Sequence, residues 1–140
     1  MSDIPYFLTE TASERALRFG YATPRFLQGA FPFAGRGLFE LTSLDDALTY
    51  TVPADCFAQI VYFRAGNASS ELIYFALAVN GVPVRYFPVG AGSDLHVPLA
   101  ISEKYGAGAT ISVLFAAPRN LSGTVIVDTG IMETRKDGGK

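Results

Sequence analysis

The sequence is short of the residue types on which most catalytic and metal-binding chemistry depends. It has no tryptophan, one histidine and one cysteine. Cys56 alone excludes an internal disulfide, and no basic neighbour in sequence would activate its thiol, so we expect a small buried residue. His96, with Asp94 two positions before it, supplies too few ligands for a metal site and no nucleophile. A Ca²⁺ site combining loop carbonyls with Asp55 or Asp128 stays an open alternative.

The nucleotide and hydrolase signatures are missing too. No Gly-x-Ser-x-Gly, P-loop or Gly-x-Gly-x-x-Gly pattern occurs in the chain. We therefore predict a protein that is not an enzyme and that uses no cofactor and no metal.

Charge is also scarce. Charged residues make up 17% of the chain, and the formal net charge of −2 argues against nucleic acid as a partner. Hydrophobic residues make up 49%, which predicts a globular protein, but no apolar run approaches the roughly 18 residues of a membrane span. The segment 1–5 lacks the basic and long apolar stretches of a secretory signal. We expect a cytoplasmic protein, or a component of an assembled particle.

What the chain has in quantity is β-forming sequence. The runs Ile73–Val79 and Val82–Val89 flank Asn80-Gly81, the strongest short signature of a β-hairpin. Only Thr11–Leu17 and Ser102–Tyr105 favour short helical turns. About eight short strands separated by turn residues predict an antiparallel, jelly-roll-like β-sandwich. The other expected strands are Gly37–Leu41, Ala47–Val52, Phe57–Ala65, Asp94–Leu99, Thr110–Ala117 and Gly123–Met132.

Three parts are expected along the chain: an N-terminal arm (1–36), the sandwich (37–134) and a flexible tail (135–140). Pro24 and Pro32 predict an irregular arm. From Arg15 to Phe39 the chain has aromatic rings and arginines but no acidic residue. That composition is typical of protein–protein contacts, although an arm that wraps its own sandwich would use the same rings. The arm residues concerned are Arg15, Arg18, Phe19, Tyr21, Arg25, Phe26, Phe31 and Phe33.

Two of the expected strands are apolar on both faces. Both Leu72–Val79 and Phe57–Ala65 place large apolar residues at odd and even positions. One face of an antiparallel sheet normally meets water, so the pattern predicts a second covering layer. The N-terminal arm or a neighbouring subunit would supply it.

A set of aromatic and polar residues near two strand ends suits sugar binding. Flat rings stack on sugars, while arginine and amide groups bind hydroxyls. The alternative is that the rings fill the core and the arginines form ordinary surface pairs. The candidate residues are Tyr62, Arg64, Asn67, Arg85, Tyr86 and Phe87.

Three segments carry a loose family resemblance. They are Phe-Ala-Leu-Ala-Val-Asn-Gly-Val-Pro-Val (75–84), Val-Pro-Leu (97–99) and Ser-Gly-Thr-Val-Ile-Val-Asp-Thr-Gly-Ile (122–131). With these three segments in this order, the chain resembles galactose-binding-like and carbohydrate-binding-module jelly rolls over about residues 37–133. The resemblance implies non-catalytic glycan binding through loop aromatics.

The sequence thus leads to two hypotheses. The first is a non-enzymatic, self-associating sandwich that serves as a structural or adaptor subunit of a larger, virion-like assembly, with itself and other subunits as partners. The alternative is a carbohydrate-binding module with a glycan as partner. Neither involves nucleic acid or a membrane.

Overall fold

The computed structural model describes residues 22–136, whose regular structure consists of strands and one short 3₁₀ helix. The elements in chain order are β1 (Ala22–Ala34), β2 (Thr42–Ser43), the 3₁₀ helix η1 (Asp46–Leu48), β3 (Thr49–Thr51), β4 (Cys56–Asn67), β5 (Ile73–Val79), β6 (Val82–Val89), β7 (Ser93–Pro98), β8 (Thr110–Ala116) and β9 (Ser122–Arg135). No helix in this part of the chain is long and apolar enough to cross a membrane.

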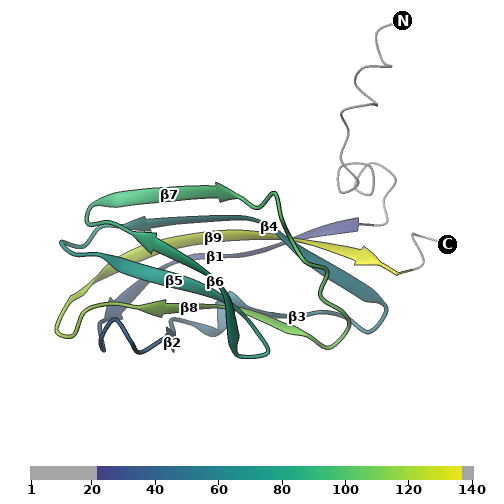
Figure 1. Ribbon diagram of the computed structural model, residues 1–140, viewed down its shortest axis with the longest axis horizontal. Coiled ribbons are helices and arrows are strands. Elements are labelled where there is room, and N and C mark those ends of the chain that lie inside the picture. The colour runs from purple at the N-terminus through teal and green to yellow at the C-terminus, as the bar shows by residue number, and fades with distance from the viewer. Residues whose placement is uncertain (1–21, 137–140) are drawn as a thin grey trace, which may run out of the picture.

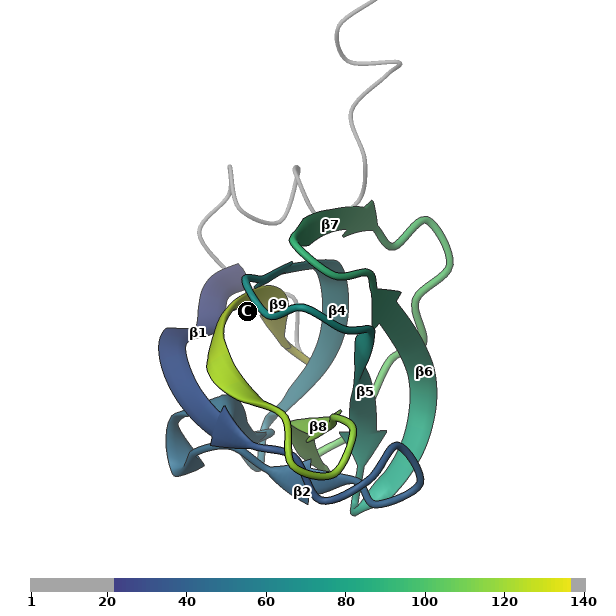
Figure 2. The same ribbon diagram turned by 90° about the vertical axis from the view of Figure 1, so that its left-hand side faces the viewer.

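The strands form two sheets that pack face to face (Figure 1). Sheet A has the order β1-β9-β4-β7, and sheet B has the order β2-β8-β5-β6, with β3 also pairing β8. All of these pairings are antiparallel. Seen from the end, the two sheets curve around a common interior (Figure 2). The predicted all-β antiparallel sandwich is confirmed.

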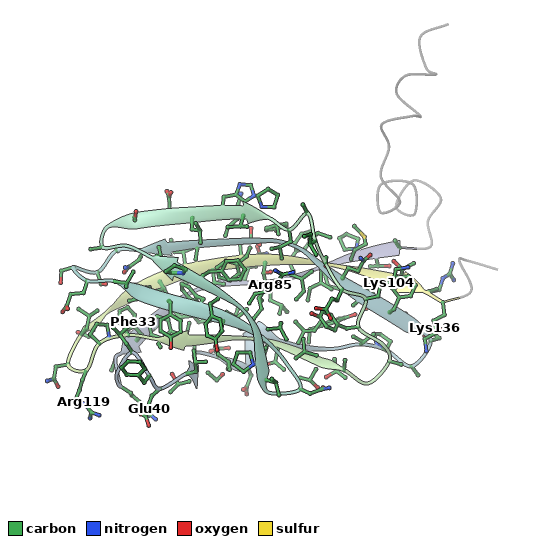
Figure 3. The ribbon with its side chains drawn as sticks, viewed as in Figure 1. Phe33, Glu40, Arg85, Lys104, Arg119 and Lys136 are labelled. Atoms are coloured by element: carbon green, nitrogen blue, oxygen red, sulfur yellow. The ribbon has the colours of Figure 1, made fainter. Side chains whose placement is uncertain are left out.

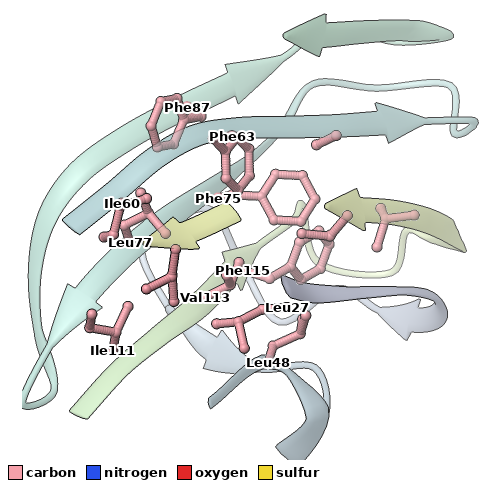
Figure 4. Close-up of a cluster of buried hydrophobic side chains, with 14 of the residues drawn as sticks. Leu27, Leu48, Ile60, Phe63, Phe75, Leu77, Phe87, Ile111, Val113 and Phe115 are labelled. Carbon is pink, nitrogen blue, oxygen red and sulfur yellow. The ribbon is translucent and has the colours of Figure 1, made fainter. Parts of the chain in front are cut away.

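Phenylalanine rings link the two sheets through the core (Figure 4). Phe63 of sheet A stacks on Phe87 of sheet B with ring centroids 4.3 Å apart, and it also contacts Phe75 at 5.5 Å. Phe115 continues the row from Phe75 to Phe33 of β1, at 5.5 and 4.8 Å. Each ring removes a large apolar area from water, so this row contributes strongly to the stability of the fold.

The predicted hairpin is present with its predicted turn. β5 ends at Val79 and β6 begins at Val82, while Asn80 and Gly81 have φ values of 52° and 81°. Both values lie in the left-handed region that Asn-Gly turns favour.

Three local expectations are wrong. Residues 37–41 form a turn in place of a strand, because Gly37 has φ 122° and interrupts the extended chain. The expected strand Ala47–Val52 begins with η1, which Asp45 caps, and becomes extended only at Thr49. The segment Ser102–Tyr105 is not helical, because Tyr105 forms an isolated β-bridge with Ala58. The expected helical turn Thr11–Leu17 lies outside the described residues.

The described part of the N-terminal arm is regular, which corrects a further expectation. Residues 22–34 form β1, an edge strand paired with β9 along its whole length. Pro24 and Pro32 are eight positions apart in this uninterrupted register, so both occupy the same kind of pairing position. A proline fits an edge strand where an N–H would point away from the partner strand, and β1 meets that condition.

Candidate functional site

The outer face of sheet B carries no charge. Arg85 is the one charged residue in the strands of this sheet, and it pairs with Leu77 on the face that meets sheet A. Outer-face positions follow from the register, since they alternate with the core residues. They are Tyr74, Ala76, Ala78, Pro83, Tyr86, Pro88, Ser112, Leu114, Ala116, Thr49, Thr51 and Ser43.

Aromatic and aliphatic side chains stand out from this face. Tyr86 is 59% exposed, and its ring lies 6.0 Å from that of Tyr74. Ala76 lies between Tyr86 and Leu114 in the register and is fully buried beneath its larger neighbours. The Tyr74 hydroxyl donates to the Leu38 carbonyl at 2.5 Å, which brings the loop with the fully exposed Phe39 beside this face. The face is therefore uncharged, with aromatic rings over β5 and β6 and hydroxyl residues on β2, β3 and β8.

Proline occurs on each long edge of the sandwich. β6 carries Pro83 and Pro88, β7 carries Pro98, and β1 has its two prolines. A proline has no N–H to offer to an added strand, so these edges resist strand-to-strand association. Contact through a sheet face is therefore the route that the fold leaves open.

The outer face of sheet A is different, because polar residues cross it in a row. Gln28, Asp128, Arg64 and His96 stand opposite one another on β1, β9, β4 and β7. The extra residue at the bulge between Ile60 and Tyr62 shifts the alternation of β4. As a result both Tyr62 and Arg64 point outward, and they share a face, as the two-residue period predicted.

Asp128 joins the polar residues of this face into a network. It accepts a hydrogen bond from the Tyr62 hydroxyl at 2.8 Å and pairs with the Arg64 guanidinium at 3.1 Å. Burial, together with the bond to Asp128, raises the pKa of Tyr62 to about 12. The Tyr62 ring covers Gly130, where a Cβ would lie 2.2 Å from a ring carbon, and it meets His96 edge-on at 6.1 Å. The network therefore holds Tyr62 in one orientation.

Beside this network lies an open hollow of about 360 Å³. Gly66 lies between Ile126 of β9 and Asp94 of β7 in the register, and all three line the hollow. Arg64, Asp128 and His96 complete its polar wall, together with backbone at residues 65 and 95. Ile126 is 61% exposed and forms an apolar surface within it.

The six residues predicted to bind a ligand do not share one surface. Tyr62 and Arg64 belong to sheet A's outer face, and Tyr86 belongs to that of sheet B. Arg85 and Phe87 do share a face, as predicted, but it is the inner one: Phe87 is buried in the core, and Arg85 donates to the Ile101 carbonyl at 3.0 Å (Figure 3).

Asn67 has a structural environment. Its buried amide donates to the carbonyls of Glu71, Val89 and Gly90 at 2.9–3.1 Å, and its oxygen accepts from Ser69. These bonds join β4 to the beginning of β5 and the end of β6.

The described residues of the N-terminal arm also lie in different environments. Phe31 and Phe33 pack on the protein's own core, Phe26 is exposed on the outer face of sheet A, and Arg25 pairs with Glu133 at 3.2 Å. Arg15, Arg18, Phe19 and Tyr21 lie outside the described residues. Cys56 is buried, as expected, and burial raises the pKa of its thiol.

Ile126 and Gly66 were not predicted as site residues, and Asp128 was considered only as a ligand of a Ca²⁺ site. The signal in the sequence was the alternation of the last strand, which places Asp128 opposite the core residues Val125 and Val127. Their meeting with Asp94 and His96 depends on the register of three strands. Within the part of the chain that the structure describes, no group of three or more metal-ligating residues gathers.

Comparisons with known proteins give a fold likeness alone. No protein-family model matches the chain, and no curated protein does. Among solved structures it is similar to a Bacillus endospore appendage of a family of disulfide-linked pili (14% identity, TM-score 0.43, covering 84% of this chain and 93% of that one). It is also similar to a family 35 carbohydrate-binding module from Clostridium thermocellum (14% identity, TM-score 0.42, covering 78% of this chain and 97% of that one). An exo-β-1,3-galactanase from Phanerochaete chrysosporium is similar at 13% identity with a TM-score of 0.37, and the match covers 80% of this chain and 29% of that one. A carbohydrate-binding module is thus among the structures to which the chain is similar, as the sequence resemblance suggested, and no functional conclusion is drawn from it.

Proposed function

We propose that this chain is a non-enzymatic, self-associating β-sandwich that serves as a structural subunit of a larger, virion-like assembly. The observation that carries the proposal is the uncharged, apolar outer face of sheet B. Exposed apolar surfaces of this kind mark sites of protein–protein contact. The proposal places the subunit in the cytoplasm or in an assembled particle.

A second copy of the chain is the partner that fits this face. A surface without charge meets its own copy without like-charge repulsion, and a two-fold axis would bring the same patch of both molecules together. The prolines of the edge strands disfavour the competing mode of association, strand addition.

The size of the face sets the strength of the contact. Strands about 4.8 Å apart and about 3.3 Å per residue make a four-stranded face of roughly 400 Å². This is about half of the ~800 Å² that each partner contributes to a standard interface. One such contact would be weak, in the micromolar range or above, and an assembly would gain stability by repeating it.

Sedimentation velocity of the full chain and two variants tests the proposal. We expect the sedimentation coefficient of the wild type to rise with protein concentration up to about 100 µM. Tyr86→Arg should stay monomeric, because its charge would be buried in the contact. Phe26→Arg, which places the same charge at a 53% exposed ring on sheet A, should associate like the wild type. A monomeric wild type, or unchanged association of Tyr86→Arg, would contradict the proposal.

The second candidate function is carbohydrate recognition. The hollow on sheet A favours it, because an exposed apolar side chain and polar groups of both hydrogen-bonding types line it. Titration of the wild type with sugars tests this function, and absence of binding by any of them would count against it.

A further inference from the structure

Gly66 is a glycine whose presence the protein's own structure does not explain. It lies in β4, an inner strand of sheet A, with β9 on one side and β7 on the other. A glycine inside a strand weakens it, because the residue loses more backbone freedom on folding and packs no side chain. A strand therefore keeps a glycine where conformation or space requires one.

Neither requirement applies here. Gly66 is not among the glycines with positive φ, so its backbone suits any residue. A Cβ built on it meets no atom within 4 Å. Gly130 and Gly123 on the neighbouring strand are different, since a Cβ would touch Tyr62 at 2.2 Å and Phe33 at 3.2 Å. Those two glycines make room for the protein's own rings, whereas the space above Gly66 is open.

We infer that the space above Gly66 is kept for a ligand, and that the ligand is the ring of a neutral sugar. A glycine in a strand often marks a place where a ligand approaches the backbone closely. This inference rests on the second candidate function, carbohydrate recognition, and names its site and its class of sugar.

The walls of the hollow define the chemistry of the ligand. The C–H face of a sugar ring would lie on Gly66 and the exposed Ile126. Asp94, which forms no salt bridge among the described residues, would accept hydrogen bonds from hydroxyls on one side. The guanidinium of Arg64 would donate from the other side. A pyranose offers both an apolar face and hydroxyls around its rim.

Charge selects a neutral sugar over an acidic one. The lining contains one guanidinium, that of Arg64, and two carboxylates, those of Asp94 and Asp128. Arg64 is already paired with Asp128, so the unmatched charge is the carboxylate of Asp94. A uronic acid would meet repulsion there.

The test compares Gly66→Val with Gly106→Val. Both glycines have open space and no positive φ, but Gly106 lies in an exposed loop away from the hollow. Glucose, galactose, glucuronic acid and a glucose oligosaccharide would be titrated into the labelled full chain and followed by amide chemical shifts. We expect a neutral sugar to bind the wild type and Gly106→Val with millimolar affinity, shifting the amides of Gly66, Asp94 and Ile126. Gly66→Val should lower that affinity at least about tenfold, and glucuronic acid should bind more weakly than glucose. A preference for the oligosaccharide would identify a glycan chain, and not a free sugar, as the source of the ring.

The outcomes separate this inference from the function on which it rests. A thermal melt of Gly66→Val at or above the wild-type midpoint shows that lost binding does not come from unfolding. Equal binding by Gly66→Val and the wild type would overturn the inference but leave carbohydrate recognition standing at another surface. Failure of all the sugars to bind the wild type would overturn both.

Discussion

Glu133 is a buried carboxylate near the C-terminal end of β9 in sheet A. Arg25 donates to both of its oxygens at 3.2 Å, and the Tyr50 hydroxyl donates at 2.6 Å. Burial by itself would raise the pKa of Glu133, but the hydrogen bonds from Arg25 and Tyr50 outweigh it and hold the pKa below its ordinary value of 4.5. A carboxyl with a lowered pKa in the folded state stabilises the fold above its unfolded pKa, and this stabilisation is lost as the pH falls through the folded pKa.

We therefore predict a pH dependence that Glu133→Gln removes. The free energy of unfolding of the wild type should fall between about pH 5 and pH 3 more steeply than that of Glu133→Gln. At pH 7 the variant should be less stable by about 2 kcal/mol, since it loses charge-assisted hydrogen bonds. Urea denaturation at a series of pH values measures both. Glu71→Gln, at an exposed position, serves as the control and should show the pH dependence of the wild type. If the free energy of unfolding of Glu133→Gln falls with pH as steeply as that of the wild type, Glu133 does not have this role.

Asn67 illustrates the limit of inference from residue type. An asparagine close to Tyr62 and Arg64 in sequence suits a sugar site, but Asn67 lies three positions after Arg64 in an uninterrupted part of β4, so its side chain points to the other face, inside the sandwich. There its amide satisfies three carbonyls. Residue type predicted a hydrogen-bonding role correctly and its partners incorrectly, because residues an odd number of positions apart in a strand lie on opposite faces.

At the scale of elements, β1 changes the interpretation of the arm. Its odd-numbered residues Leu27, Phe31 and Phe33 face the core, while Phe26 faces outward. The composition of the arm fitted both an intermolecular contact and packing on its own domain. For residues 22–34 the structure shows packing on the protein's own sheet. For the preceding arginines and rings, an intermolecular contact remains a prediction.

Two phenylalanines in the same strand provide a matched test. Phe33→Ala should destabilise the protein by about 3 kcal/mol, because it leaves a cavity beside Phe115. Phe26→Ala should change stability by about 0.5 kcal/mol or less, because the ring is already half exposed. Thermal melts of both variants measure the difference. Equal shifts of the melting midpoint would show that the inward-facing side chains of β1 do not stabilise its packing on the core.

The strand boundaries were predictable where turn chemistry is local. β5 and β6 begin and end at the predicted residues. The Asn80-Gly81 turn defines the end of β5 and the beginning of β6. Residues 37–41 were predicted wrongly, since their composition suits a strand but no neighbouring strand pairs with them. Pairing partners are distant in sequence, and local propensity does not contain them.

At the scale of the whole molecule, the two outer faces differ in charge, and so should their response to salt. Association through the uncharged face of sheet B should change little between about 0.05 and 0.5 M NaCl, because screening acts on charges. Sodium sulfate should strengthen it, since such salts favour the burial of apolar surface. Sedimentation at several salt concentrations measures both effects. Association that weakens steeply with NaCl would indicate the charged face of sheet A instead.

The sequence by itself determined that this protein is an antiparallel β-sandwich, because alternation, β-branched and aromatic runs and turn residues act over a few neighbouring positions. It also placed Tyr62 and Arg64 on one face, which the two-residue period of a strand requires. Only the tertiary structure decided which residues share a surface. The hollow over Gly66 combines β4, β7 and β9, and the uncharged face combines strands from across the chain. The register between strands distant in sequence creates both surfaces, and that register depends on the packing of the core.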